Sequence, residues 1–191
     1  MQSVREQQKQ DRKTRIFEVA HELYRERGFA ETTVSDIAKA AQVSRGTVFN
    51  YYPYKEAILI EDLAQQLSSM EDRVKARAKS PVEALYLVFA EIADYFEENR
   101  DLVLPLCYEL LNPDPERSKY AFTSLPLARI CKEYLMASEN IRTGYSADRL
   151  ARTVANTFFI TALQWAAYRQ ERSIHEELKK ALELTLEGLL A

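Results

Sequence analysis

The stretch that decides the fold is TTVSDIAKAAQVSRGTVFNYYPYKEAIL, residues 32–59. Its apolar residues recur at offsets of three, four and seven and share one helical face: Val34, Ile37, Ala38 and Ala41. Thr33 stands where an N-cap residue belongs, and Asp36, three residues later, can complete a capping box. After a short turn, Ser44 is a second N-cap candidate and begins a short helix over residues 45–52. The pattern predicts a helix-turn-helix, whose second helix enters a groove of DNA.

The second helix of this motif has an inward and an outward face. Val48 and Tyr52 fall on the inward face, which leaves these residues pointing largely outward: Arg45, Gly46, Thr47, Asn50 and Tyr51. Arg45 is the best candidate to read a base, because its planar guanidinium can donate to both acceptors of a guanine in the major groove. Thr47 can touch a thymine methyl group.

The other candidate DNA contacts are less specific. Gly46 lets the backbone approach the duplex, and Asn50 reads a base or a backbone oxygen. The remaining candidates lie at the helix starts or suit phosphate contacts: Thr33, Ser44, Tyr51 and Lys55. Lys55 begins the next predicted helix, residues 55–79, whose first amides also favour anions.

In these residues the chain resembles the tetracycline-repressor (TetR) family of bacterial transcriptional regulators. The resemblance is close over about the first sixty residues and rests on these runs: Arg15-Ile16, Arg27-Gly28-Phe29, Thr32-Thr33-Val34, Asp36-Ile37-Ala38, Val43-Ser44, Gly46-Thr47-Val48-Phe49, Tyr51-Tyr52 and Lys55-Glu56. It implies an all-α fold of about nine helices. It also implies a DNA-binding domain over residues 1–54 and a ligand-binding and dimerisation domain over residues 55–191, linked by the helix over residues 55–79.

Two residues depart from the family pattern. Gln42 stands where the family usually has glycine, so a positive φ there would cost about 1 kcal/mol. Tyr54 stands where a small polar cap often precedes the lysine, so the next helix forgoes a cap worth ~1 kcal/mol. Neither departure lies on the DNA-facing surface, so both affect stability more than function.

Charge is divided unevenly along the 191 residues. The net charge is -3, but residues 1–55 hold ten Lys and Arg against seven acids, and residues 56–191 hold sixteen against twenty-two. Basic charge is therefore concentrated in the predicted DNA-binding part, although a surplus of this size is also found on ordinary solvated surfaces. The chain has no signal peptide and no run of eighteen apolar residues, so we expect a cytoplasmic protein without a membrane span.

Catalytic and metal-binding signals are weak. Cys107 and Cys131 are expected to be buried free thiols, and His21 and His175 show no ligand spacing, so we expect neither a metal nor a cofactor. A nucleophile elbow and a glycine-rich phosphate loop are both missing, which disfavours an enzyme. A helical adaptor for protein partners remains the alternative, and it predicts no sequence-selective binding of DNA.

The pattern of the rest of the chain predicts helices whose ends are marked by Gly, Pro and Ser residues. Residues 2–10 lack periodicity and are expected to form a disordered or frayed arm. The resemblance implies that such an arm can lie along DNA, where Arg5 and Lys9 can contact phosphate. The predicted helices outside the motif cover residues 11–27, 55–79, 81–98, 101–111, 115–138, 147–170 and 174–190, with a loop over residues 140–146. Pro105 and Pro126 should kink or break the helices that contain them.

Thirteen of the twenty aromatic residues fall between residues 81 and 170. Each alone is most simply part of an aromatic core, but the resemblance implies a largely apolar small-molecule cavity in this part. The candidate ligand contacts are Tyr86, Phe89, Phe96, Tyr108, Phe122, Phe158 and Trp165. The candidate polar anchors, for which a surface position is the alternative, are Glu91, Glu109 and Arg129.

The last two predicted helices suit close packing. The helix over residues 147–170 carries small residues at Ala151, Ala155, Ala162 and Ala166. The helix over residues 174–190 carries an apolar stripe: Ile174, Leu178, Leu182, Thr185 and Leu189. The stripe either closes the core of one subunit or, as the resemblance implies, forms a two-fold dimer that reads an inverted repeat. Relief of repression by a small, largely apolar effector is the leading expectation, and activation is left open.

Overall fold

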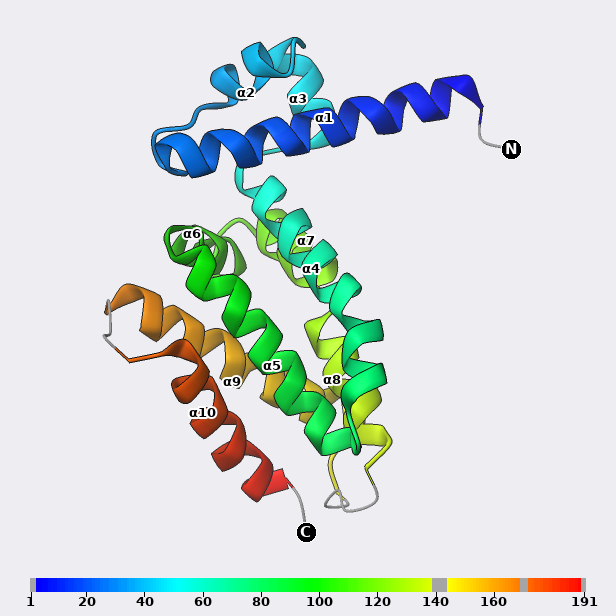
Figure 1. Cartoon of the computed structure of the whole chain (residues 1–191), viewed down its shortest axis with the longest axis vertical. Helices are drawn as coiled ribbons and strands as arrows, with labels where there is room; N and C mark the ends of the chain where they lie inside the picture. Colours follow the sequence, from blue (N-terminus) through cyan, green and yellow to red (C-terminus); the bar gives the residue numbers. More distant parts are fainter. Residues whose placement is uncertain (1–2, 139–143, 169–171, 190–191) are drawn as a thin grey trace. The chain divides into compact units, whose positions relative to one another are not determined.

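The computed structural model describes residues 3–138, 144–168 and 172–189 and shows an all-helical chain (Figure 1). The helices are α1 (Val4–Arg27), α2 (Val34–Ala40), α3 (Arg45–Tyr51), α4 (Glu56–Arg77), α5 (Pro81–Glu98), α6 (Arg100–Leu110), α7 (Pro115–Ser124), α8 (Leu127–Met136), α9 (Ala147–Ala167) and α10 (Ile174–Leu189). The chain divides into two compact units, Met1–Leu59 and Ile60–Ala191, called here the N-terminal and C-terminal units. No helix among the described residues is long and apolar enough to cross a bilayer.

The N-terminal unit has a small core between α1, α2 and α3. Its fully buried side chains include Ile16, Ala20, Ile37, Val48 and Tyr52. Thr32, also buried, donates its hydroxyl to the carbonyl oxygens of Gly28 (2.9 Å) and Leu23 (3.3 Å), which ties the start of α2 to the end of α1. The residue after α1 is Gly28, with φ of 85° and ψ of 157°; a left-handed helical (αL) stop was expected there, but only the φ is positive, a backbone conformation that favours glycine.

The first helix begins earlier than the sequence pattern predicts. Residues 4–10, expected as a disordered arm, are the first turns of α1. A capping box explains the difference, because the Ser3 hydroxyl accepts from the Glu6 amide (3.2 Å) and the Glu6 carboxylate accepts from the Ser3 amide (2.8 Å). The Ser-x-x-Glu signal was present in the sequence, but without apolar periodicity behind it the segment did not read as a helix.

The C-terminal unit is a bundle of helices in which α5 packs against α8 and α10, and α9 packs against α6, α8 and α10. The predicted start of α5 is confirmed, since the Ser80 hydroxyl accepts from the Glu83 amide (3.1 Å) and Pro81 occupies the first helical position. The core is rich in apolar side chains from α5, such as Leu85, Phe89 and Phe96.

The two internal prolines have different effects on their helices. Pro105 stays inside α6, whereas the segment predicted as one helix over residues 115–138 is two helices, because the chain is extended at Leu125 (ψ 117°) and α8 begins after Pro126. The described part of the chain therefore holds ten helices rather than about nine. Part of the predicted loop over residues 140–146, and the predicted helix ends at Gln170 and Leu190, lie outside the described residues.

Candidate functional site

The start of α2 has the predicted capping box. The Thr33 hydroxyl accepts from the Asp36 amide (3.2 Å), and the Asp36 carboxylate accepts from the Thr33 amide (2.9 Å) and hydroxyl. These hydrogen bonds from Thr33 hold the pKa of the exposed Asp36 carboxyl below its ordinary value. The Thr33 hydroxyl is therefore already engaged in the cap, and its predicted phosphate contact stays a prediction.

The start of α3 is fixed in the same way. The Ser44 hydroxyl accepts from the Thr47 amide (3.0 Å) and lies 2.8 Å from the Thr47 hydroxyl. As predicted, Val48 and Tyr52 are buried. The candidate DNA contacts on the other face of α3 are exposed or half-buried: Arg45, Gly46, Thr47, Asn50 and Tyr51. Local capping thus fixes the start of α3, and all five residues stay at least partly accessible on it.

The turn between α2 and α3 carries backbone strain at the predicted place. Gln42 has φ of 55°, in the left-handed region that favours glycine. The turn is held by backbone hydrogen bonds from the Gln42 amide to Lys39 (3.2 Å) and from the Val43 amide to Ala38 (2.9 Å). The glutamine side chain is exposed, so the departure from glycine bears on stability and leaves the outward face of α3 unchanged.

Lys55 has a structural role that the sequence did not indicate. Its Nζ donates to the carbonyl oxygens of Phe29 (2.7 Å) and Thr32 (2.9 Å) and lies 3.9 Å from the centre of the Phe29 ring. Burial lowers the pKa of this ammonium group below its ordinary value. Lys55 joins the start of α4 to the segment between α1 and α2, and its predicted phosphate contact stays a prediction.

Phe49 was missed as a candidate. It lies on α3 next to Asn50, and 42% of its surface is exposed, which is unusual for a large apolar side chain in a small unit. An exposed aromatic ring on this helix can contact thymine methyl groups or sugar. The signal was available, because Phe49 falls off the face defined by Val48 and Tyr52.

The C-terminal unit contains a cavity of about 330 Å³. Its walls come from α4, α5, α6, α8 and α9, and they are mostly apolar, for example Leu63, Leu67, Ile92, Phe96, Leu106 and Phe158. The volume lies in the range of small-molecule sites. Two polar side chains of α9, Arg152 and Asn156, also line the cavity, and both are largely exposed, which places them at its opening.

The predicted aromatic contacts separate into three groups. Phe96 and Phe158 line the cavity, and so does Phe159, which was not among the candidates. Phe89 and Trp165 are buried core residues that do not line it: Phe89 packs edge-on against Phe158 with ring centres 5.0 Å apart, and Trp165 donates to the Arg172 carbonyl (2.9 Å). Contact of any of them with a ligand stays a prediction.

Of the last three aromatic candidates, two do not line the cavity, and the side chain of the third lies outside the described residues. Tyr86 is half-buried and does not line the cavity, and Tyr108 is 60% exposed. The side chain of Phe122 lies outside the described residues. Residues on one helix face can be listed from sequence, but which face meets the cavity depends on the packing of the neighbouring helices.

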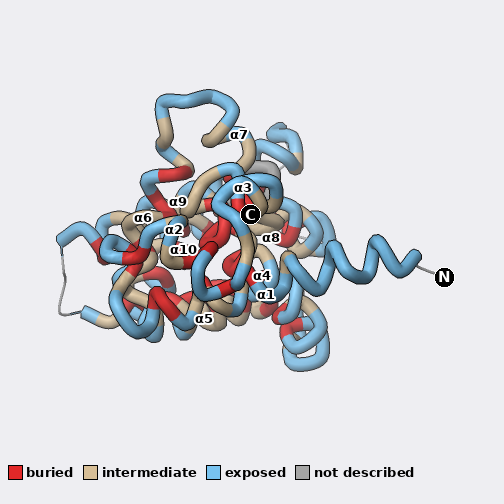
Figure 2. The backbone as a smooth tube through the Cα atoms, turned by 90° about the horizontal axis from the view of Figure 1, so that it is seen from above, coloured by how far each residue is buried: buried red, intermediate tan, exposed pale blue. Residues whose placement is uncertain are grey.

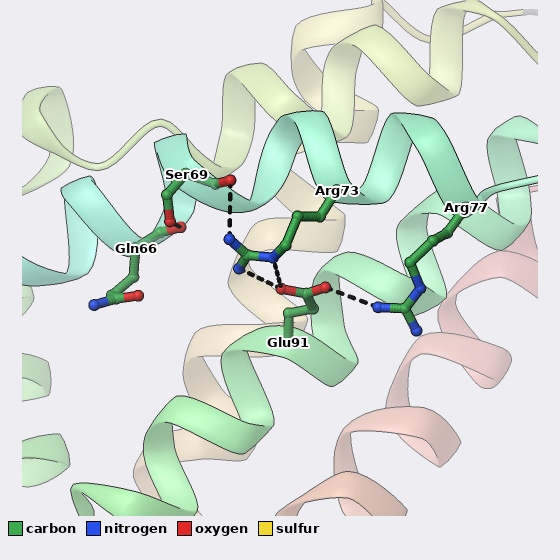
Figure 3. Close-up of polar contacts among 5 residues, drawn as sticks. All are labelled: Gln66, Ser69, Arg73, Arg77 and Glu91. Atoms are coloured by element: carbon green, nitrogen blue, oxygen red, sulfur yellow. Dashed lines mark hydrogen bonds and ion pairs between the residues drawn. The ribbon is translucent and has the colours of Figure 1, made fainter.

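The three predicted polar anchors all form ion pairs outside the cavity lining, Glu91 and Glu109 with arginines and Arg129 with glutamates. Glu91 of α5 accepts from Arg73 (2.6 Å) and Arg77 (3.0 Å) of α4, as Figure 3 shows. Buried Glu109 accepts two hydrogen bonds from the Arg117 guanidinium, at 2.6 and 2.9 Å.

The third anchor, Arg129, donates to the carboxylate of Glu71 on α4. It also donates to Glu133 of its own helix, with 2.7 Å between the guanidinium nitrogen and the carboxylate oxygen. The polar groups that do line the cavity, Arg152 and Asn156, were missed because α9 shows no pattern that separates them from other exposed residues.

The two cysteines are buried free thiols, as predicted. Cys107 lines the cavity and Cys131 does not. Burial raises the pKa of each thiol to about 12, so both stay protonated at neutral pH and are weak nucleophiles. Cys107 therefore serves as another apolar wall of the cavity.

Comparisons with known proteins agree with this arrangement. Residues 16–61 match the model of bacterial regulatory proteins of the tetR family, and residues 59–188 match that of the C-terminal domain of TetR/AcrR family transcriptional repressors. The fatty acid metabolism regulator protein of Bacillus subtilis (strain 168) is 29% identical over 197 aligned positions, covering 95% of this chain and 97% of the relative.

Two solved structures are similar over nearly the whole chain. Thermus thermophilus FadR, a TetR-family transcriptional repressor in complex with lauroyl-CoA, is 47% identical with a TM-score of 0.86, covering 94% of this chain and 95% of the other. Bacillus subtilis FadR in complex with stearoyl-CoA is 26% identical with a TM-score of 0.69, covering 92% and 98%. The chain therefore belongs to the TetR/AcrR family and is a DNA-binding transcriptional regulator.

Proposed function

We propose that the protein is a dimeric repressor that binds an inverted-repeat operator and is released from it by a long-chain acyl thioester. The observation that carries the ligand assignment is the apolar cavity whose wall includes Leu63 and Leu67 of α4, the helix that begins directly after the DNA-reading motif. Because its target is chromosomal DNA, we place its action in the bacterial cytoplasm.

The DNA-reading surface of α3 supports sequence-specific binding. Arg45 is exposed at the first position of α3, where the bidentate reach of a guanidinium suits a guanine edge. The same helix carries Thr47, Phe49 and Asn50. Gly46 has no side chain, so the backbone can approach the DNA closely at that position. One such short helix reads few base pairs, so a pair of them about 34 to 36 Å apart is needed to read an operator.

The outer face of α9 and α10 is the proposed dimer contact. The predicted apolar stripe of α10 is not available for this purpose, since Ile174, Leu178 and Leu182 are buried within the protomer. The other face carries Ile160, which is 46% exposed, and Leu184, which is 72% exposed. Exposed apolar side chains on two adjacent helices favour a four-helix contact between two copies.

The cavity supports an amphipathic ligand with one charged end. Its walls would bury an acyl chain, and Arg152 and Asn156, one helical turn apart at its opening, would meet a polar or anionic head. The similarity to two regulators in complex with lauroyl-CoA and stearoyl-CoA narrows this class to acyl-CoA. Methylene burial contributes about 0.8 kcal/mol per group, so affinity should rise with chain length until the cavity is full.

Ligand binding releases the DNA if the ligand binds more tightly to the conformation of the protein that does not bind DNA. An occupied cavity changes the packing against Leu63 and Leu67, and therefore the position of α4. A coupling of about 1 to 3 kcal/mol corresponds to a 5- to 150-fold loss of DNA affinity. A ligand with equal affinity for both forms would release nothing.

The experiment is a selection of binding sites from random duplexes, followed by calorimetry with lauroyl-CoA and free CoA. We expect an inverted repeat to be enriched, and lauroyl-CoA but not CoA to bind. Arg152→Gln should weaken lauroyl-CoA binding about tenfold, while Arg149→Gln, a matched loss of charge on α9 outside the cavity lining, should not. Enrichment of no sequence would refute the DNA assignment, and absence of lauroyl-CoA binding would refute the ligand assignment.

A further inference from the structure

The cavity of the C-terminal unit is closed on one side and open on the other. The lining residues on α4 and α5 are all buried: Leu63, Leu67, Ile92 and Phe96. The lining residues that are half-buried or exposed lie at the end of α6, at the junction of α7 and α8 and on α9: Leu110, Leu125, Leu127, Ala128, Arg152, Ala155, Asn156 and Phe159. The cavity therefore opens between α9, the end of α6 and the junction of α7 and α8.

Both ends of α7 lie at the rim of this opening. Leu110, the last residue of α6, lines the cavity, and so does Leu125, the residue directly after α7. The chain between them, residues 111–124, is a short loop followed by α7. We call this segment the α7 flap. Because both of its ends meet the rim, a movement of the flap changes the width of the opening.

The α7 flap has little apolar anchorage. Among the described residues α7 packs mainly against α6, and Ala121 is the one buried residue among the α7 side chains that the structure describes. In Figure 2, where burial is shown by colour, the rest of the flap belongs to the exposed and half-buried classes. The backbone is extended at Leu125, so a few torsions there suffice to turn the flap. A segment with few buried apolar contacts opens locally at a low cost in free energy.

One ion pair holds the flap to α6. Glu109 of α6 is 5% exposed, and its carboxylate accepts hydrogen bonds from the guanidinium group of Arg117 on α7, at 2.6 and 2.9 Å. The side-chain amide of Asn112, in the loop of the flap, donates to the same carboxylate (3.2 Å). The Arg117 side chain is 30% exposed, so its end of the pair lies at the surface. A buried carboxylate without its partner is costly, so the pair favours the position of the flap seen here.

We propose that the α7 flap is a lid on the cavity and that the Glu109–Arg117 pair is its latch. When the pair separates, the flap moves and the opening widens, so that a ligand can enter or leave. The proposal rests on the proposed function in taking the cavity as the ligand site. A lid that must open in both directions sets the rates of exchange and leaves the affinity unchanged, because easier opening speeds binding and release by the same factor.

The test removes the latch without leaving a buried charge unpaired. The latch variant Glu109→Gln/Arg117→Gln lacks both charges, and surface plasmon resonance on the full-length protein measures its association and dissociation rate constants for lauroyl-CoA. We expect both rate constants to rise about tenfold or more, the factor typical of a charge-assisted hydrogen bond, with Kd within about twofold of wild type. The control Arg73→Gln/Glu91→Gln removes an ion pair between α4 and α5, outside the cavity lining (Figure 3), and should keep the wild-type rate constants.

A measurement without ligand separates this inference from the proposed function. Cys107 lines the cavity and Cys131 does not, and both are buried free thiols. Because burial raises the pKa of each thiol to about 12, we expect each to react with N-ethylmaleimide only when its surroundings open. In the latch variant the labelling of Cys107 should be about tenfold faster, and that of Cys131 should be unchanged. Mass spectrometry of the two cysteine peptides over time measures both rates.

Arg117→Lys is a milder variant, which keeps the charge but loses the paired hydrogen bonds, and it should raise the same rates by a smaller factor. Circular dichroism checks that each variant keeps its helices. Labelling of Cys107 at the wild-type rate in both variants would overturn the lid. A faster dissociation with unchanged association would also overturn it, because the pair would then stabilise the bound complex. Faster labelling of Cys107 in a protein that does not bind lauroyl-CoA would support the lid and refute the proposed ligand alone.

Discussion

The ammonium group of Lys55 lies 2.7 Å from the carbonyl oxygen of Phe29, so the residue before α4 is bonded to the segment that follows α1. A second hydrogen bond, to the Thr32 carbonyl at 2.9 Å, reaches the start of α2. The Tyr24 hydroxyl completes the connection by donating to the Lys55 carbonyl (3.4 Å). The entry to α4 is thereby fixed to the first two helices of the N-terminal unit.

Lys55→Met tests this connection. It keeps the side-chain stem but removes both hydrogen bonds, and we expect the free energy of unfolding to fall by about 1 to 2 kcal/mol, since the carbonyl oxygens regain only partial hydration. Binding to all DNA sequences should weaken alike. Lys39→Met, which removes an exposed lysine of α2, is the control for stability in thermal denaturation. Equal melting temperatures for the two variants would show that Lys55 has no structural role.

Asp36 gives a prediction about pH. Its folded-state pKa lies below the unfolded value, so the carboxylate stabilises the fold at pH values above the unfolded pKa, and this is lost as the pH falls through the folded pKa. Asp36→Asn should therefore melt at a lower temperature than wild type at pH 7, and the difference should vanish in acid. Glu31→Gln removes an exposed acid outside the cap and should match wild type throughout. A gap of constant size from pH 7 to acid would contradict the charged cap.

Arg45 should carry sequence preference. Arg45→Ala removes the proposed bidentate base contact, which would be worth about 1 to 3 kcal/mol of discrimination, so the ratio of operator to random-DNA affinity should collapse while salt-sensitive binding persists. Parallel titrations of a selected duplex and a scrambled duplex measure this ratio. An unchanged ratio would remove Arg45 from the reading surface.

The dimer prediction concerns Leu184. Leu184→Glu places a charge in the proposed contact between copies, where an unpaired buried charge is strongly destabilising, so sedimentation should show monomers and operator affinity should fall. Leu111→Glu is the matched control, because Leu111, which follows α6, is also an exposed leucine, with 54% of its surface exposed against 72% for Leu184. Dimers of Leu184→Glu with normal operator affinity would place the contact elsewhere.

Much of the fold was accessible from sequence because the decisive signals are local. Thr33 and Ser44 were identified as N-cap residues, and each hydroxyl accepts the expected hydrogen bond from an amide of the helix that follows it. Pro126 was recognised as a disruption, but whether a proline kinks or ends a helix depends on the ψ angle before it, here an extended Leu125.

The remaining features depend on contacts between distant residues. Lys55 bonds to backbone carbonyls 26 and 23 residues away, and carbonyls leave no mark in a sequence. Arg152 and Phe159 line the cavity because α9 is rotated by its packing against α6, α8 and α10. Helical periodicity lists the residues on each face of α9 but does not say which face encloses the cavity.

The most direct measurement of the central claim is DNA release by lauroyl-CoA. Three proteins are each bound to a duplex selected by wild type: wild type itself, Ala155→Phe and Ala167→Phe. Ala155→Phe fills part of the cavity, whereas Ala167→Phe adds the same ring at an exposed position of α9. We predict that lauroyl-CoA releases DNA from wild type and Ala167→Phe but not from Ala155→Phe, and that free CoA releases none. Retention of DNA by wild type at saturating lauroyl-CoA, or release from all three proteins alike, would contradict the account.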